Sequence, residues 1–356
     1  MSPAGAGAAR VVPGWVLRSP GGRLSGRVRP RTLAVGVVLA VALLATSAVT
    51  LSTGDYPVPL RDLIGSLLGH GDPASDFIVI TLRLPRLLAG LLVGAALGVS
   101  GALLQSLSGN PLGSPDIVGF TSGAATGALV VIIVTGGDLR AISVGAVTGG
   151  VAAAVLVYLL ALRGGSPGLR LILVGIGVSA MLVAANYYLI TRARLETALA
   201  AQVWLTGSLN GRGWEQVRPA LVAVGVLLPA ALAYGRRLAL LELGDDAAAA
   251  LGVPVRRTRL LLVGVSVALA AVATAAAGPI VFVALAAPHL ARRLARSAAP
   301  TILPAALLGA LLLVGGDLLT QRAFGTRQLP VGITTGALGG LYLAWLLVHE
   351  WRRGRG

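Results

Sequence analysis

Ten long apolar segments constrain the fold of this chain more than any other feature of its sequence. Most of them hold about twenty residues with almost no charge, which is the length that an α-helix needs to cross roughly 30 Å of hydrocarbon. Apolar runs of this length are typical of transmembrane helices. The sequence therefore predicts an all-α polytopic membrane protein with about ten transmembrane helices. The apolar segments lie at 32–53, 87–107, 117–135, 141–162, 171–191, 217–234, 259–277, 280–292, 303–320 and 330–349.

Composition and the distribution of arginine support this topology. Hydrophobic residues make up 56% of the 356 residues, mean hydropathy is +0.86, and all 29 basic residues are Arg. If the N-terminus is cytoplasmic, 19 of these Arg but only 5 of the 13 acidic residues fall on the cytoplasmic side. Because basic residues concentrate in cytoplasmic loops, this excess predicts that both termini are cytoplasmic.

The chain divides into one membrane domain and two polar ends. Residues 1–30 are rich in Arg, Gly and Pro without periodicity, so we expect a disordered cytoplasmic tail. The apolar run that follows is too long for a typical signal peptide, and we expect it to remain as the first span. Residues 31–350 then form a single ten-helix domain, and 351–356 form a short cytoplasmic tail.

Glycines recur at every fourth position in several spans, for example at Gly90, Gly94 and Gly98. Small residues at this spacing let helix backbones approach closely, so these glycines predict helix packing within one bundle. Helices that slide or tilt during transport are the alternative interpretation.

Several activities are excluded by what the sequence lacks. There is no Cys for thiol chemistry and no Lys for a P-loop or a Schiff base. The three His are scattered without an HExxH pattern, and aromatic residues are too few to favour nucleic-acid binding. We therefore expect no catalytic residue, no bound metal or cofactor, and no nucleic-acid partner. An intramembrane enzyme lacks a recognisable site, and the scarcity of acids in the spans disfavours an ATP-independent secondary transporter.

Three polar islands fall on the cytoplasmic side under this topology. The turn SGNPLGSPD at 108–116 cannot continue a helix, and Asp116 is expected to cap the next span. Segment 235–259 predicts two short helices joined at Gly244 and ended by Gly252, with Asp245 and Asp246 as caps. It is either a connector lying on the membrane face or a docking element for a soluble partner. In 278–293, Pro288 is expected to kink or end the helix.

Arginines and one acid mark the outer side. Arg83 and Arg86 flank Pro85 at the start of the second span, and Arg322 follows the ninth. Such Arg side chains either snorkel to the interface or receive carboxylates from a docked protein. Asp317 lies within the ninth span, where an acid needs a partner or a wet pathway. A hydrogen bond between packed helices is the milder interpretation.

These features together resemble a known family, the membrane permeases of ABC importers for ferric siderophores and vitamin B12. The resemblance spans about residues 33–350, and two runs are most similar to ferric enterobactin-type permeases: GNPLGSPDIVGF and LETALAAQVWLTGSLNG. The matching blocks are LRLPRLLAGLLVGAALGVSGALLQSLSGNPLGSPDIVGFTSGA (82–124), LELGDDAAAALGV (241–253), AGPIVFVALAAPHLARR (277–293) and LPVGITTGALGGLYLAWLL (329–347).

The resemblance implies a type II ABC importer permease in the cytoplasmic membrane, paired with a second permease subunit. It implies an extracytoplasmic siderophore-binding protein and two cytoplasmic ATPase subunits, which hold ATP and Mg. Alternating access would then move a ferric siderophore inward. Pairing with an identical or a sibling permease stays open, and vitamin B12 or haem is the alternative cargo.

The resemblance also implies roles for residues at matching positions. The turn is expected to be structural, through Asn110, Pro111, Pro115 and Asp116. Contacts with the ATPase are implied for Glu242, Gly244, Asp245, Asp246, Leu251 and Gly252.

For the outer face, the resemblance implies that glutamates of the binding protein meet Arg83, Arg86 and Arg322. Arg322 is one position off the family spacing from Asp317. The cytoplasmic gate would fall at Ser166, Gly168 and Leu169, although the local sequence GGSPGLR departs from the polar pair of the family.

Overall fold

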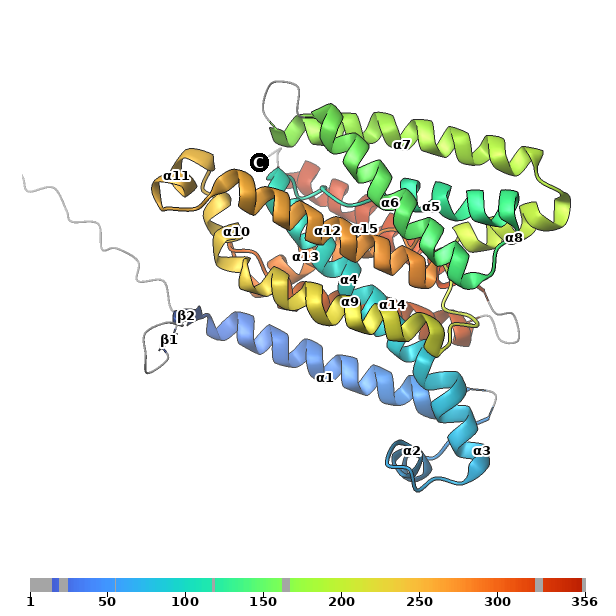
Figure 1. Ribbon diagram of the computed structural model, residues 1–356. Coiled ribbons are helices and arrows are strands. Elements are labelled where there is room, and N and C mark those ends of the chain that lie inside the picture. Colours follow the sequence, from blue (N-terminus) through green and yellow to red (C-terminus); the bar gives the residue numbers. More distant parts are fainter. Residues whose placement is uncertain are drawn as a thin grey trace, which may run out of the picture.

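Helices account for nearly all of the structure that the computed structural model describes, which covers residues 15–18, 25–54, 56–116, 119–161, 167–323 and 329–353. They run roughly along one axis and form a bundle (Figure 1). The elements are β1 (Trp15–Arg18), β2 (Ser25–Val28), α1 (Pro30–Ser52), α2 (Leu60–Leu67), α3 (Pro73–Asp76), the π-helical η1 (Phe77–Arg83), α4 (Leu84–Ser108), α5 (Phe120–Val130), the π-helical η2 (Val131–Thr135), α6 (Leu139–Ala161), α7 (Pro167–Arg192), α8 (Leu195–Leu205), α9 (Trp214–Ala233), α10 (Gly235–Leu241), α11 (Asp245–Ala250), α12 (Val255–Ala277), α13 (Val283–Ala295), α14 (Ile302–Ala323) and α15 (Val331–Arg353).

Each predicted span corresponds to a helix. Within the described residues, seven helical runs are long and apolar enough to cross a membrane, and the run through α3, η1 and α4 is 36 residues long. The apolar runs through α5–η2 and in α15 are shorter. The start of α1, the end of α15 and α10–α11 lie at one end of the bundle, and α2, α3 and α8 lie at the other (Figure 1). This arrangement agrees with a polytopic protein whose termini share one face.

Two predictions need correction at the level of elements. The predicted span 280–292 is instead a helix that lies three residues later, at Val283–Ala295, because the chain before it turns at Phe282, whose φ is 70°. Pro288 lies inside this helix and does not end it. In the expected unstructured tail, β1 and β2 pair antiparallel, with Trp15 opposite Val28. Strands of four residues are too short to give a periodic signal in the sequence.

Helix α4 forms the centre of the bundle and packs on α12, α13 and α14. Its glycines permit this, since a Cβ placed on Gly94 would lie 2.4 Å from the carbonyl oxygen of Gly309 in α14. A Cβ on Gly101 would lie 1.7 Å from the carbonyl oxygen of Ala284 in α13. Pro288, four residues later, offers that carbonyl no N–H donor. The predicted role of the glycine stripe in close helix packing is confirmed.

Candidate functional site

The candidate site at the cytoplasmic end is built from α10 and α11, which we call the inner helix pair (235–250). The chain turns between them at Gly244, whose φ of 104° favours glycine. Helix α11 ends before Gly252, whose φ is 79°, and the N–H of Val253 donates to the carbonyl of Ala248 at 3.0 Å. The predicted helix–Gly–helix arrangement is confirmed.

The two acids of the inner helix pair lie in the first turn of α11, where the helix dipole favours negative charge. Neither forms the predicted hydrogen-bonded cap. Asp245 instead accepts a hydrogen bond from Arg259 of α12, with Nη2 2.8 Å from Oδ1. Arg259, fourteen residues away in the sequence, binds this carboxylate in place of the backbone N–H groups of α11. The ion pair therefore connects α11 to the start of α12.

Arg292 of α13 connects the inner helix pair to the centre of the bundle. Its Nη2 donates to Glu242 Oε1 at 2.5 Å and also to the hydroxyl of Ser106 in α4. Both members of the ion pair are largely enclosed, with side-chain exposures of 26% for Arg292 and 19% for Glu242. One guanidinium thus joins α4, α13 and the end of α10. Sequence reasoning assigned no role to Arg292, which lies at the end of the block AGPIVFVALAAPHLARR.

The turn at 108–116 lies beside the inner helix pair. Asn110 organises it, accepting from the N–H of Leu112 with its side chain and from the N–H of Gly113 with its carbonyl, both at 2.9 Å. Together with α10, α11 and α13, the turn lines a cavity of about 510 Å³ that Pro111, Glu242 and Arg292 help to enclose. The tertiary structure therefore brings the predicted cytoplasmic islands together at one cavity: the turn at 108–116, segment 235–259 and the end of segment 278–293.

Asp116, at the end of this turn, forms a different contact from the one predicted. Its carboxylate accepts from the hydroxyl of Thr121 at 2.7 Å and from the backbone N–H of Phe282. Gly119, not Asp116, is the N-cap of α5. Burial raises the pKa of Asp116 to about 6, and the two hydrogen bonds oppose this rise. Asp116 therefore links the turn to the left-handed residue that precedes α13.

At the outer end, Arg86 and Asp317 form a two-pronged ion pair between α4 and α14. Arg86 Nε lies 2.9 Å from Oδ2 and Nη2 lies 2.8 Å from Oδ1, while Asp317 is only 4% exposed. Gln321 adds a third hydrogen bond to the carboxylate at 2.7 Å. The predicted hydrogen bond of Asp317 between packed helices is thus present, and its partner is one of the arginines predicted to face outward.

The other two predicted outer arginines differ in environment. Arg83 donates from Nη1 to the carbonyl of Leu51 at 2.8 Å and from Nη2 to that of Tyr56, and so holds the connection between α1 and α2. Arg322 is exposed in the last turn of α14. The three side chains are therefore not equivalent, and two of them bind within the chain.

Comparison with known proteins supplies the identity. The family model described as the FecCD transport family matches residues 37–349. The chain belongs to the FecCD transport family. The permease FepG of Escherichia coli, named for ferric enterobactin transport, is 50% identical over 326 residues, which cover 92% of this chain and 99% of FepG. The permease BtuC of Halobacterium salinarum, named for cobalamin import, is 35% identical over 89% of this chain and 88% of its own length.

Structural similarity agrees with this FecCD assignment. A solved structure described as an inward-facing metal-chelate type ABC transporter superposes with a TM-score of 0.78. It is 29% identical and covers 89% of this chain and 99% of that chain. The FecCD chain is accordingly a multi-pass transport permease of the cytoplasmic membrane and a component of a transport complex, not an enzyme.

The predicted gate of this FecCD permease lies at the edge of what the structure describes. Ser166 falls outside the described residues, while Gly168 and Leu169 lie in the first turn of α7.

Sequence reasoning missed the polar contacts inside the bundle. Ser100 and Ser266 join α4 to α12, with their hydroxyls 2.9 Å apart. Nothing in a single sequence pairs two serines 166 positions apart.

Proposed function

We propose that this chain is the membrane-spanning subunit of an ATP-driven importer of ferric siderophores. The observation that carries this proposal is the 50% sequence identity with FepG along almost the whole length of both chains. A catecholate siderophore of the enterobactin type is therefore the proposed cargo. Vitamin B12 is the alternative cargo, since a cobalamin permease belongs to the same group of relatives, and haem is another.

The inner helix pair is proposed as the docking surface for two cytoplasmic ATPase subunits, which would hold ATP and Mg. Leu243 and Leu251 support this, because they lie just before and just after the acidic helix α11 and are 65% and 60% exposed. Apolar side chains next to carboxylates on a projecting turn suit a protein contact. Arg292 would carry movement of this surface into the bundle, through its bonds to Glu242 and Ser106.

An extracytoplasmic siderophore-binding protein is proposed to dock on the opposite face. Arg83, Arg86 and Arg322 remain the predicted contacts, and the exposure of Arg322 supports its part. A second permease subunit is proposed to complete the pathway, with the gate at Ser166, Gly168 and Leu169. The exposed aliphatic surface of α7 is compatible with either this subunit or lipid, because only 17% of its most apolar window is buried within the chain.

Uptake by the reconstituted complex tests the proposal. Proteoliposomes containing the permease, its ATPase and its binding protein are supplied with radiolabelled ferric enterobactin, cyanocobalamin or haem in parallel. We expect uptake of the ferric siderophore that requires ATP and survives collapse of the proton gradient. Uptake that stops with an uncoupler at constant ATP contradicts ATP-driven transport, and uptake of cyanocobalamin or haem alone replaces the proposed cargo.

A further inference from the structure

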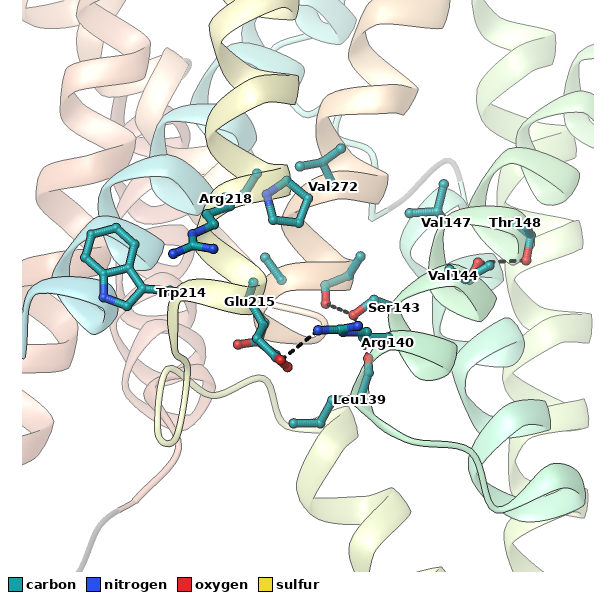
Figure 2. Close-up of a pocket in the computed structure, with 15 residues that line it drawn as sticks. Leu139, Arg140, Ser143, Val144, Val147, Thr148, Trp214, Glu215, Arg218 and Val272 are labelled. Atoms are coloured by element: carbon teal, nitrogen blue, oxygen red, sulfur yellow. Dashed lines mark hydrogen bonds and ion pairs between the residues drawn. The ribbon is translucent and has the colours of Figure 1, made fainter. Parts of the chain in front are cut away.

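A second cavity, unrelated to the inner helix pair, lies between α6, α9 and α12 and encloses about 750 Å³ (Figure 2). We call it the outer groove. Helices α6 and α9 both pack on α12, so α12 forms its floor. The floor consists of Val272, Ala275 and Ala276, and the wall on α6 is lined by Val144 and Val147. A volume of this size lies within the roughly 300–1,000 Å³ typical of small-molecule sites.

The groove lies at one end of the bundle. It is lined by the first turns of α6 and α9 and the last turns of α12, which are the outer ends of these helices. Trp214 lies at the mouth, and its indole Nε1 donates to the carbonyl of Ile80 at 3.0 Å. Trp side chains gather at the interface between hydrocarbon and water, and Arg side chains can extend their charged ends into it. The mouth therefore sits where a headgroup would lie.

The walls around the groove face hydrocarbon. Val144 on α6 is 62% exposed, and Leu221 and Val222 on α9 are 53% and 68% exposed. The polar side chains on the α6 wall are already satisfied. Ser143 donates to the carbonyls of Leu139 and Ala275 at 2.9 and 3.1 Å, and Thr148 donates to that of Val144 at 2.9 Å. The interior thus favours an acyl chain over a polar polypeptide backbone.

The charge at the mouth matches a phosphate. Arg140 Nη2 lies 2.9 Å from Glu215 Oε1, and both side chains stay well exposed, at 74% and 58%. Arg218 also lines the groove, and within the part of the chain that the structure describes it has no hydrogen bond or ion pair. Figure 2 shows Arg140 and Glu215 facing one another across the opening. Two arginines against one carboxylate leave one positive charge, which complements a phosphodiester.

We propose that the outer groove binds one phospholipid of the outer leaflet. The headgroup phosphate lies against Arg140 and Arg218, and an acyl chain runs along Val144, Val147 and Val272. The lipid fills the space between α6 and α9 that no side chain fills. Because the net charge at the mouth is positive, the site prefers anionic phosphatidylglycerol to zwitterionic phosphatidylcholine.

Photolabelling in nanodiscs tests this proposal. The full-length chain is reconstituted in phosphatidylcholine with a minor fraction of phosphatidylglycerol that carries a diazirine in its acyl chain. We expect label on the groove residues of α6 and α12, and a several-fold loss of that label in the Arg140→Gln/Arg218→Gln double variant. Glu215→Gln breaks the same ion pair as Arg140→Gln but is expected to increase labelling, because it removes the carboxylate that competes with the phosphate.

Two controls separate this site from general surface charge. Arg192→Gln/Arg194→Gln removes two arginines at the same membrane face, outside the groove, and should leave groove labelling unchanged. Excess inorganic phosphate should not compete, because it has no acyl chain. Unchanged labelling in the Arg140/Arg218 variant, or a loss of labelling in Glu215→Gln, would overturn the proposal. A further test uses Val144→Cys in the assembled complex, since the chain has no other cysteine. Cross-linking of this cysteine to another protein chain would show that a protein occupies the groove and would overturn the proposal.

Discussion

At the scale of single residues, two acids in the described part of the chain have specific partners. Asp317 is held by Arg86 and Gln321, and Asp116 by Thr121 and the backbone of Phe282. A buried charge without a partner is costly, so each of these bonds matters more than an exposed ion pair would. Both acids join segments that are distant in the sequence.

Removing one member of the outer ion pair should destabilise the fold strongly. Arg86→Gln leaves the Asp317 carboxylate buried without its cation, which we expect to cost about 3–5 kcal/mol. The double variant Arg86→Gln/Asp317→Asn removes both charges and should recover most of that loss. Thermal unfolding in detergent measures both. If the double variant is no more stable than the single one, the pair does not act as described.

Asp116 should make stability depend on pH in an unusual direction. Burial raises its pKa from 3.8 to about 6, so between these values the folded state binds more protons than the unfolded state. The contribution of this carboxyl to stability is therefore complete below the unfolded pKa of 3.8 and is lost as the pH rises through about 6.

The measurement compares melting temperatures at several pH values from about 4 to about 7, a window that spans the unfolded pKa of 3.8 and the folded pKa of about 6. Asp116→Asn should flatten the fall in stability that wild type shows on going from the acidic to the neutral end. An identical pH dependence in both proteins would contradict the assignment.

At the scale of elements, backbone conformation decides where the helices stop. Gly244 separates α10 from α11 with a φ of 104°, and no atom lies within 4 Å of the position that a Cβ would take. Any effect of a substitution there is consequently conformational and not steric. Phe282 adopts a φ of 70° without being glycine, and its N–H is held by Asp116. That bond offsets part of the cost of the left-handed conformation.

Gly244→Ala should weaken the coupling between ATP hydrolysis and transport while leaving membrane insertion intact. With φ 104° and ψ 155°, Gly244 lies in a region that is open essentially only to glycine, so alanine costs on the order of 1–3 kcal/mol of backbone strain and distorts the turn between the two inner helices. Gly264→Ala is the matched control, because Gly264 also has open space around it but lies within helix α12. We expect a lower ratio of cargo moved to ATP hydrolysed for the first variant only. Equal ratios would argue against a coupling role for this turn.

At the scale of the whole molecule, the bundle has two chemically different ends. One holds the inner helix pair with its acids and exposed leucines, and the other holds the ion pair of Arg86 and Asp317 and the mouth of the outer groove. This asymmetry is compatible with the different partners that we propose for the two faces. The glycines of α4 hold the centre tightly packed between the two ends.

The orientation can be tested with single cysteines, since the chain has none of its own. Leu195 at the outer end of the bundle is 76% exposed and Leu251 at the inner end is 60% exposed. In right-side-out vesicles, an impermeant maleimide should label Leu195→Cys at once and Leu251→Cys only after lysis. The reverse pattern would invert the topology.

The sequence by itself determined the fold class, the approximate position of the spans and the helix–Gly–helix motif, and it predicted the orientation. These follow from hydrophobic length, arginine distribution and local backbone preferences, which act over neighbouring residues. Only the tertiary structure decided that Arg86 binds Asp317, that Asp116 binds Phe282, and that Arg292 joins three helices. Each of these contacts joins residues from separate segments of the chain. Which polar groups come within hydrogen-bonding distance therefore depends on how the helices pack, and no local sequence pattern encodes that packing.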